Sequence, residues 1–80
     1  MSQSLNIIKS KVDELPNNIE AEQSVIGSIL LANEIFDEVS LIISSKNFYD
    51  PIHRKIFNAL EKLIYGGLLA NPITLKNYFE

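Results

Sequence analysis

One segment, residues 50–67, constrains the fold most because it contains a complete helix with its start and its stop. It reads DPIHRKIFNALEKLIYGG. Asp50 suits the N-cap position and Pro51 the first helical position, while Gly66 and Gly67 favour the end of a helix. An apolar stripe runs between these signals, through Ile52, Ile56, Leu60, Leu63 and Ile64. We therefore expect an amphipathic helix between Pro51 and Gly66.

A second amphipathic helix is expected after the proline at residue 16. Asn17 or Asn18 can cap its free amide groups, and Glu20 and Glu22 lie near the positive end of the helix dipole. Its apolar centre is formed by Ile26, Ile29 and Leu30, with Glu22 and Asn33 on the same side. This spacing is typical of a helix that buries one face.

A third helix is expected to follow with almost no loop. Asn33 can end one helix and cap the next. The apolar residues then repeat with helical period at Ile35, Phe36, Val39, Ile42 and Ile43. The sequence SSKNFYD, residues 44–50, favours a single helical turn from which Phe48 and Tyr49 enter the core.

The last helix is expected near the end of the chain, with Thr74 as its cap and with Leu75, Tyr78 and Phe79 on one face. It reaches Glu80 without a stop signal, so we expect the domain to be incomplete at this end. No strand pattern or internal repeat is present in the sequence. The fold is predicted to be an all-α compact bundle of about four main helices and one single-turn helix, with short loops.

The domain is expected to span residues 16–80, after a flexible arm at residues 1–15. Alternatively, the arm forms a short helix that docks on a neighbour through Leu5, Ile8 and Val12. A chain of 80 residues buries only about 60% of the surface that its unfolded form exposes, so its core is thin. Because it has no cysteine, a disulfide or a thiolate metal site is excluded, and a partner surface is the expected additional source of stability.

Charge and hydropathy exclude several classes of function. The seven basic residues are scattered among ten acidic ones, giving a formal net charge of −3, whereas duplex binding needs clustered positive charge. Direct DNA binding by this segment is therefore disfavoured. No apolar run approaches the roughly 20 residues that span a bilayer, and no secretory signal is present, so we expect no membrane contact and a cytoplasmic location.

The search for catalytic groups finds none. There is no GxxxxGK[ST] phosphate loop and no nucleophile motif, so we expect this chain to have no catalytic, cofactor-binding or metal-binding residues and not to turn over a nucleotide. His53 is the only histidine, and no metal-ligand residue stands four positions after it, so it is interpreted as a surface or interface residue. The acidic pairs Glu20/Glu22 and Asp37/Glu38 are interpreted as helix-start carboxylates.

A stripe of small residues marks the candidate interface. Ser24, Gly27, Ser28 and Leu31 share one side of the residue 17–33 helix with Glu20. A glycine in the middle of a helix costs about 1 kcal/mol relative to alanine, so Gly27 indicates the close approach of another helix. That helix belongs either to this domain or to a partner. His53 and Arg54, on the residue 50–67 helix, complete the candidate interface residues.

Three runs carry a family resemblance. They are LPNNIEAEQSVIGSILLANEIFDEV, then NFYDPIHRKIFNAL, then a double-glycine turn followed by NPITLKNYFE. Together they resemble the N-terminal domain of DnaB-type replicative DNA helicases of bacteria, from about Leu15 to Glu80. The run Ile19–Val25 and Gly27 match the family's first signature, and the second is matched by Phe48, Tyr49, Pro51, His53, Arg54, Ile56 and Phe57.

The resemblance implies an all-helical domain in the upper tier of a hexameric ring, where it pairs with its neighbours and receives the C-terminal domain of primase during replication initiation. ATP and Mg²⁺ would be bound by a separate RecA-like C-terminal domain, and DNA would be contacted only through that larger protein. This family's N-terminal domain also continues into a helical hairpin that the chain lacks. The alternative is a stand-alone helical adaptor or a helix-turn-helix DNA-binding domain, although Asp37, Glu38 and Ser40 are poor recognition residues.

Overall fold

The computed structural model describes residues 11, 13, 15 and 18–80, and within them it contains helices and no strands. The elements are α2 (Ile19–Leu31), the 3₁₀ turn η1 (Asn33–Ile35), α3 (Phe36–Ile42), the 3₁₀ turn η2 (Ser45–Asn47), α4 (Pro51–Tyr65) and α5 (Pro72–Phe79). The all-α prediction is confirmed. Most of the predicted arm at residues 1–15, with Leu5, Ile8 and Val12, lies outside the described residues, so its conformation stays a prediction.

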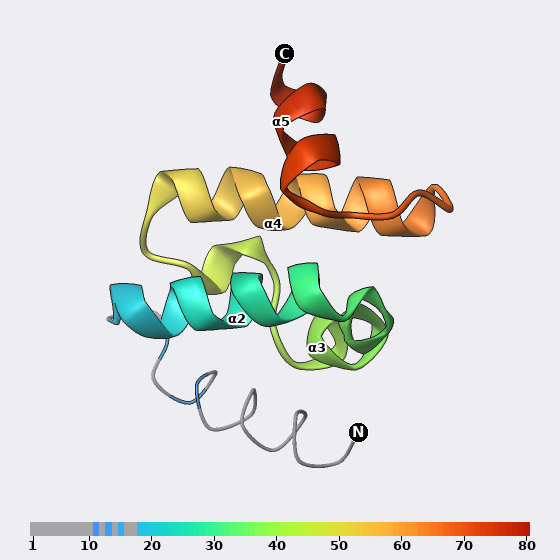
Figure 1. Ribbon diagram of the computed structural model, residues 1–80. Helices are drawn as coiled ribbons and strands as arrows, with labels where there is room; N and C mark the ends of the chain where they lie inside the picture. The colour runs from blue at the N-terminus through green and yellow to red at the C-terminus, as the bar shows by residue number, and fades with distance from the viewer. Residues whose placement is uncertain (1–10, 12, 14, 16–17) are drawn as a thin grey trace.

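Helices α2 and α4 form the two main layers, with η2 between them (Figure 1). α3 follows at the C-terminal end of α2, and α5 packs against α4. The core between these elements contains three phenylalanines. The ring centroid of Phe57 lies 5.2 Å from that of Phe36 and 5.2 Å from that of Phe48, so α4 is joined through this cluster to α3 and to the η2 turn.

Helix α2 begins as the sequence predicts. The side chain of Asn18 accepts a hydrogen bond from the amide of Ala21 at 3.0 Å, which satisfies one free donor of the first turn. Ile26 and Ile29 are buried and Leu30 is half-buried against the core, as expected from the apolar side of the helix. Asn17 lies outside the described residues.

The joint after α2 differs from the prediction. Asn33 does not cap α3 with its side chain; a 3₁₀ turn comes first. Instead, the Asn33 amide donates to the carbonyls of Ile29 and Ala70, and its oxygen accepts from the amide of Ala70 at 2.7 Å. The Asn33 side chain therefore binds the backbone of Ala70, 37 residues away, and not the first turn of α3. This clamp holds the loop before α5 against the end of α2.

Two aromatic residues directly after the η2 turn, Phe48 and Tyr49, were expected to share the core. Ser44 and Asn47 form a reciprocal capping box around the turn. Phe48 is then fully buried, whereas Tyr49 is 64% exposed, so the prediction for Tyr49 was wrong. Consecutive residues in the extended segment after the turn point in opposite directions, and only one of them can face the core.

Helix α4 has the predicted ends and a rotated buried face. Asp50 accepts from the amide of Ile52 at 2.8 Å, Pro51 is the first residue, and Gly67 has a positive φ of 82° after the last turn. Ile52 was expected in the core but is 64% exposed. The buried residues are His53, Phe57, Ala59, Leu60 and Leu63. The helix is turned so that the Phe57 ring fills the space between Phe36 and Phe48.

Helix α5 begins three residues earlier than predicted. Its cap is Asn71, whose side chain accepts from the amides of Ile73 and Thr74 at 2.9 Å. The Thr74 hydroxyl instead accepts from the amide of Asn71, in a capping box, so the assignment of Thr74 as the cap was wrong. Leu75 is half-buried against the core, while Tyr78 and Phe79 are about half exposed at 43% and 51%.

Candidate functional site

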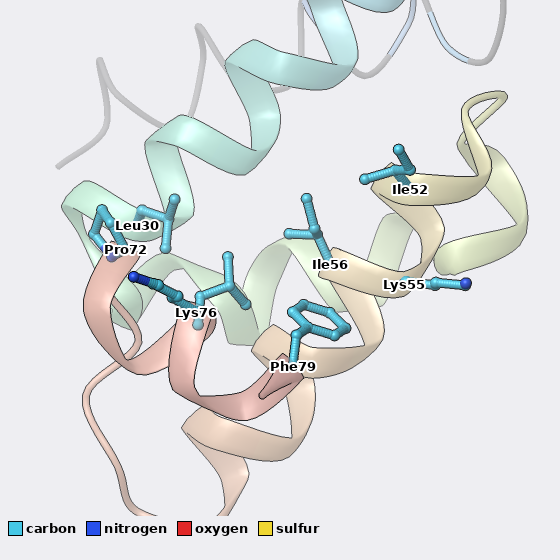
Figure 2. Close-up of a pocket in the computed structure, with 8 residues that line it drawn as sticks. Leu30, Ile52, Lys55, Ile56, Pro72, Lys76 and Phe79 are labelled. Atoms are coloured by element: carbon cyan, nitrogen blue, oxygen red, sulfur yellow. The ribbon is translucent and has the colours of Figure 1, made fainter.

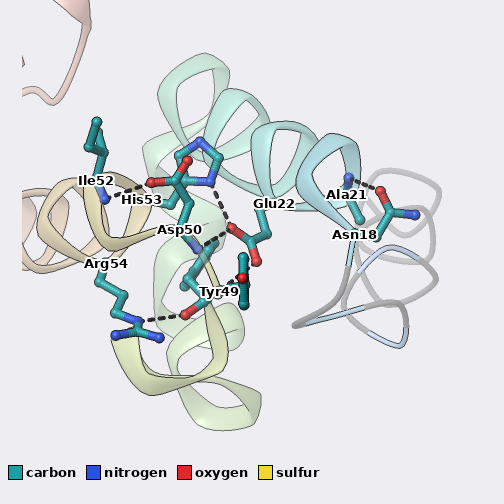
Figure 3. A network of polar contacts seen from close by, with 9 residues as sticks. Asn18, Ala21, Glu22, Tyr49, Asp50, Ile52, His53 and Arg54 are labelled. Carbon is teal, nitrogen blue, oxygen red and sulfur yellow. Dashed lines mark hydrogen bonds and ion pairs between the residues drawn. The ribbon is translucent and has the colours of Figure 1, made fainter.

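A buried glutamate organises the polar contacts at the start of α4 (Figure 3). The carboxylate of Glu22, on α2, is fully buried. It accepts hydrogen bonds from the amide of Tyr49 at 2.6 Å, from the amide of Asp50 at 3.3 Å and from Nδ1 of His53 at 2.8 Å. Because a carboxylate only accepts, Nδ1 is the protonated ring nitrogen in this arrangement. These bonds attach α2 to the first turn of α4.

This network bears on two sequence interpretations. His53 is 8% exposed, so it is not a surface histidine. Glu22 does lie in the first turn of α2, as predicted, but it is a buried acceptor for groups outside its own helix. The signal for Glu22 was its place on the apolar side of α2, beside Ile26 and Ile29. Its partners are 27 to 31 residues away, which helical spacing cannot reveal. Glu20 is exposed, consistent with the role predicted for it.

The hydrogen bonds of Glu22 connect two helices, so we interpret the network as structural. Every buried side-chain nitrogen or oxygen in the described residues has a hydrogen-bond partner. Within residues 11, 13, 15 and 18–80, no group of three or more His, Cys, Asp or Glu side chains could hold a metal ion. No helix in the same residues is long and apolar enough to cross a membrane.

Arg54 lies at the surface next to this network. Its Nε donates to the carbonyl of Phe48 at 2.6 Å, so the side chain is held across the η2–α4 turn. The residue is exposed, unlike its neighbour His53. An anchored, exposed arginine loses less conformational entropy on contact with a partner than a free one does.

The small-residue face, defined as Ser24, Gly27, Ser28 and Leu31, is accessible. Ser24 is exposed, Leu31 is 90% exposed, and Gly27 and Ser28 are half-buried. The Ser28 hydroxyl donates to the carbonyl of Ser24 at 2.8 Å, within α2. Apart from Gly27, its two chain neighbours and the adjacent backbone of α2, no atom of the described residues lies within 4 Å of a Cβ placed on Gly27. In the described residues, therefore, no helix of the same domain packs closely on Gly27.

The predicted site residues form two separate groups. Four lie along α2 on the small-residue face, and the other two lie at the start of α4, where only Arg54 is exposed. Sequence reasoning missed a third surface, a groove between α4 and α5, because Ile52 was assigned to the core. The sequence feature that could have indicated this groove is the pair of aromatic residues at the end of α5, Tyr78 and Phe79, which are about half exposed.

Comparisons with known proteins agree with this helical architecture. Residues 14–80 match the family described as the DnaB-like helicase N terminal domain. The chain belongs to this family. No solved structure gives a significant match.

The chain spans only 13–17% of the length of the three curated relatives named here. It is 49% identical over 63 residues to the replicative DNA helicase DnaB of Rickettsia felis, which covers 79% of the chain and 13% of that protein. It is 41% identical over 83 residues to the Rickettsia typhi protein of the same name, covering 96% of the chain and 17% of that protein. The corresponding protein of Buchnera aphidicola (subsp. Baizongia pistaciae) is 40% identical over 70 residues, covering 88% and 15%.

Proposed function

We propose that this chain is a non-catalytic assembly and interaction domain of a hexameric replicative DNA helicase. It would build the N-terminal tier of the ring by pairing with copies of itself, and it would receive the C-terminal domain of primase when replication is initiated. In this proposal ATP, Mg²⁺ and DNA are bound elsewhere in the helicase, and the protein works in the cytoplasm. The division into an arm at residues 1–15 and a domain at 16–80 is part of the same proposal.

The observation that carries the proposal is the accessible small-residue face, in a chain that belongs to the helicase family. A mid-helix glycine with no described atom near it has no packing role in the described fold, and it costs about 1 kcal/mol of helix stability. Close approach of a second helix would offset that cost. Leu31 adds an exposed apolar side chain at the end of the same face.

The self-association is tested by substituting Gly27. We expect Gly27→Leu to fold as well as the wild type or better, since leucine favours helix by about 0.5–1 kcal/mol and no described neighbour obstructs it. The leucine should instead keep a partner helix at a distance and raise the dissociation constant of the dimer at least about tenfold, or roughly 1.4 kcal/mol. Light scattering over a range of concentrations gives the mass, and urea denaturation gives the stability.

The matched control is Asn58→Leu, which adds the same side chain at an exposed position of α4. It should leave both the mass and the free energy of unfolding nearly unchanged. A wild-type chain that stays monomeric at all concentrations would refute self-association through this face. Equal dimerisation of the wild type and Gly27→Leu would do so as well.

Primase docking is tested by adding the C-terminal domain of the cognate primase to the same solution. We expect one complex whose mass is the sum of its components. We also expect weaker capture by Arg54→Ala, because arginines are enriched among the residues that dominate interfaces and Arg54 is exposed. Lys62→Ala, at an exposed position of the same helix, is the control. A mass that does not change at micromolar concentrations of both proteins would remove primase docking from the proposal.

A further inference from the structure

Helix α5 is held to the rest of the described chain by few buried side chains. None of its eight residues is buried, whereas α2 and α4 each bury five. Leu75 is half-buried against the core, but Ile73 is 71% exposed. Segments with few buried apolar contacts open at the lowest free energies in native proteins. We therefore expect α5 to separate from the core more readily than α2 or α4.

The apolar contact that α5 makes with its neighbours is also open. A groove of about 420 Å³ lies between α4 and α5, and Leu30 of α2 contributes to its lining. Figure 2 shows Leu30 beside Pro72, the first residue of α5, and Ile56 of α4 beside Phe79, the last. Apolar groups that face an open space lose the partner atoms that a close-packed interior supplies. These contacts therefore hold α5 less firmly than a close-packed interface would.

The clamp between Asn33 and Ala70 supplies a specific link. The amide of Ala70 donates to Oδ1 of Asn33 at 2.7 Å, and Nδ2 of Asn33 donates to the carbonyl of Ala70 at 3.0 Å. One side chain thus satisfies both backbone groups of Ala70, which is the only buried residue of the segment 64–80. Nδ2 also donates to the carbonyl of Ile29 at 2.8 Å, so the clamp is anchored in the last turn of α2.

The segment that the clamp holds has defined limits. The Thr74 hydroxyl donates to the carbonyl of Leu69 at 2.8 Å, so the loop from Leu69 onward is bound to α5 and would move with it. On the other side, the amide of Leu68 donates to the carbonyl of Leu63 at 2.9 Å, which keeps Leu68 on the end of α4. The backbone between Leu68 and Leu69 is therefore the place where a rotation would separate the two parts.

We propose that residues 69–79 open from α2 and α4 as one body, and that the Asn33 side chain is the clamp that keeps them closed. In the open state both backbone groups of Ala70 are solvated, and the groove is lost because α5 supplies half of its lining. The cluster of three phenylalanines and the network of Glu22 contain no residue of this unit, so both stay intact. One asparagine at the end of α2 thus controls whether α5 is docked on α4.

Two distances distinguish the closed conformation from the open one. Since the chain has no cysteine, nitroxide labels can be attached at introduced cysteines alone. The pair Glu20→Cys and Asn77→Cys reports on α2 and α5, and the pair Glu20→Cys and Asn58→Cys reports on α2 and α4; all three positions are exposed. Double electron–electron resonance measures each distance, with unlabelled chain in excess to remove distances between copies.

Removing the clamp should broaden only one of the two distances. A minor conformation is typically populated at about 0.1–10%, and we expect Asn33→Ala to raise the open fraction at least about tenfold. A second, broader set of α2–α5 distances should then appear, while the α2–α4 distance stays narrow. Asn33→Ser should act in the same direction, because its hydroxyl can still donate to the carbonyl of Ile29 but is too short to bind Ala70.

Glu34→Ala, at the exposed position next to Asn33, is the control and should leave both distances as they are in the wild type. If neither variant of Asn33 alters the α2–α5 distance, the clamp does not hold α5 and the proposal is overturned. It is also overturned if both variants broaden the α2–α4 distance, because α5 then opens only with the whole chain. Where the two variants differ, Asn33→Ser decides. The opening needs neither self-association nor primase, so its failure leaves the proposed function intact, and a failure of the Gly27 experiment leaves the clamp intact.

Discussion

Replacing Glu22 with alanine should lower the free energy of unfolding by about 3–5 kcal/mol, because it removes one partner of a buried, hydrogen-bonded pair. The amides of Tyr49 and Asp50 and Nδ1 of His53 would all lose their acceptor. Each buried donor left unpaired costs roughly 1–3 kcal/mol. A domain of this size gains only about 3–5 kcal/mol from its core, so Glu22→Ala should be largely unfolded at 25 °C. Far-UV circular dichroism with a urea titration measures the effect.

A milder variant keeps the experiment quantitative. Glu22→Gln preserves the shape but replaces one acceptor oxygen with a donor, and it should lose about 2 kcal/mol while remaining folded. Glu20→Gln, at an exposed position one half-turn earlier on the same helix, should change stability by less than about 0.5 kcal/mol. Equal losses at Glu20 and Glu22 would contradict the view that the buried acceptor joins α2 to α4.

Local signals in the sequence predicted most of the helices. Asp50 and Pro51 at the start of α4 and the glycines after it act within a few residues of their own backbone, so short-range spacing is sufficient to find them. The same holds for Asn18 and for the capping residues Ser44 and Asn47. At the last helix the sequence pattern indicated Thr74 as the cap, whereas the cap in the structure is Asn71, three residues earlier.

Contacts between distant residues could not be predicted in this way. The residues around Asn33 do not determine whether its side chain caps α3 or binds another segment. In the structure it is held by its hydrogen bonds to Ala70. His53 looks solvated beside Arg54 and Lys55, but the acceptor that buries it comes from another helix. The small-residue face was visible in the helical spacing, whereas its accessibility depends on what packs against α2. The groove was missed because it needs the relative placement of α4 and α5.

The aromatic cluster is the other joint on which the fold depends, and Phe48→Ala should lower the free energy of unfolding by about 3–5 kcal/mol. Phe48 is fully buried, and its ring lies 5.2 Å from that of Phe57 and 6.4 Å from that of His53. The η2 turn is too short to hold itself in place, so the position of the α4 N-terminus depends on this ring as well as on Glu22. Removing the ring leaves a cavity that the flanking turn cannot fill without breaking its capping box.

Tyr49→Ala is the matched control, because it deletes a neighbouring aromatic ring that is 64% exposed and keeps the amide that Glu22 accepts. It should cost less than about 1 kcal/mol. Phe48→Leu, which keeps most of the volume, should cost about 1.5 kcal/mol or less and so provides a folded variant for the urea titration. If Phe48→Ala and Tyr49→Ala destabilise the chain equally, the two residues share the core as the sequence pattern predicted, and the extended segment after η2 does not separate them. If the losses differ by 2 kcal/mol or more, as we expect from the difference between buried and exposed sites, Phe48 and not Tyr49 holds the η2 turn against the core. The start of α4, which carries Arg54, is then held in place through the contact between the Phe48 and Phe57 rings.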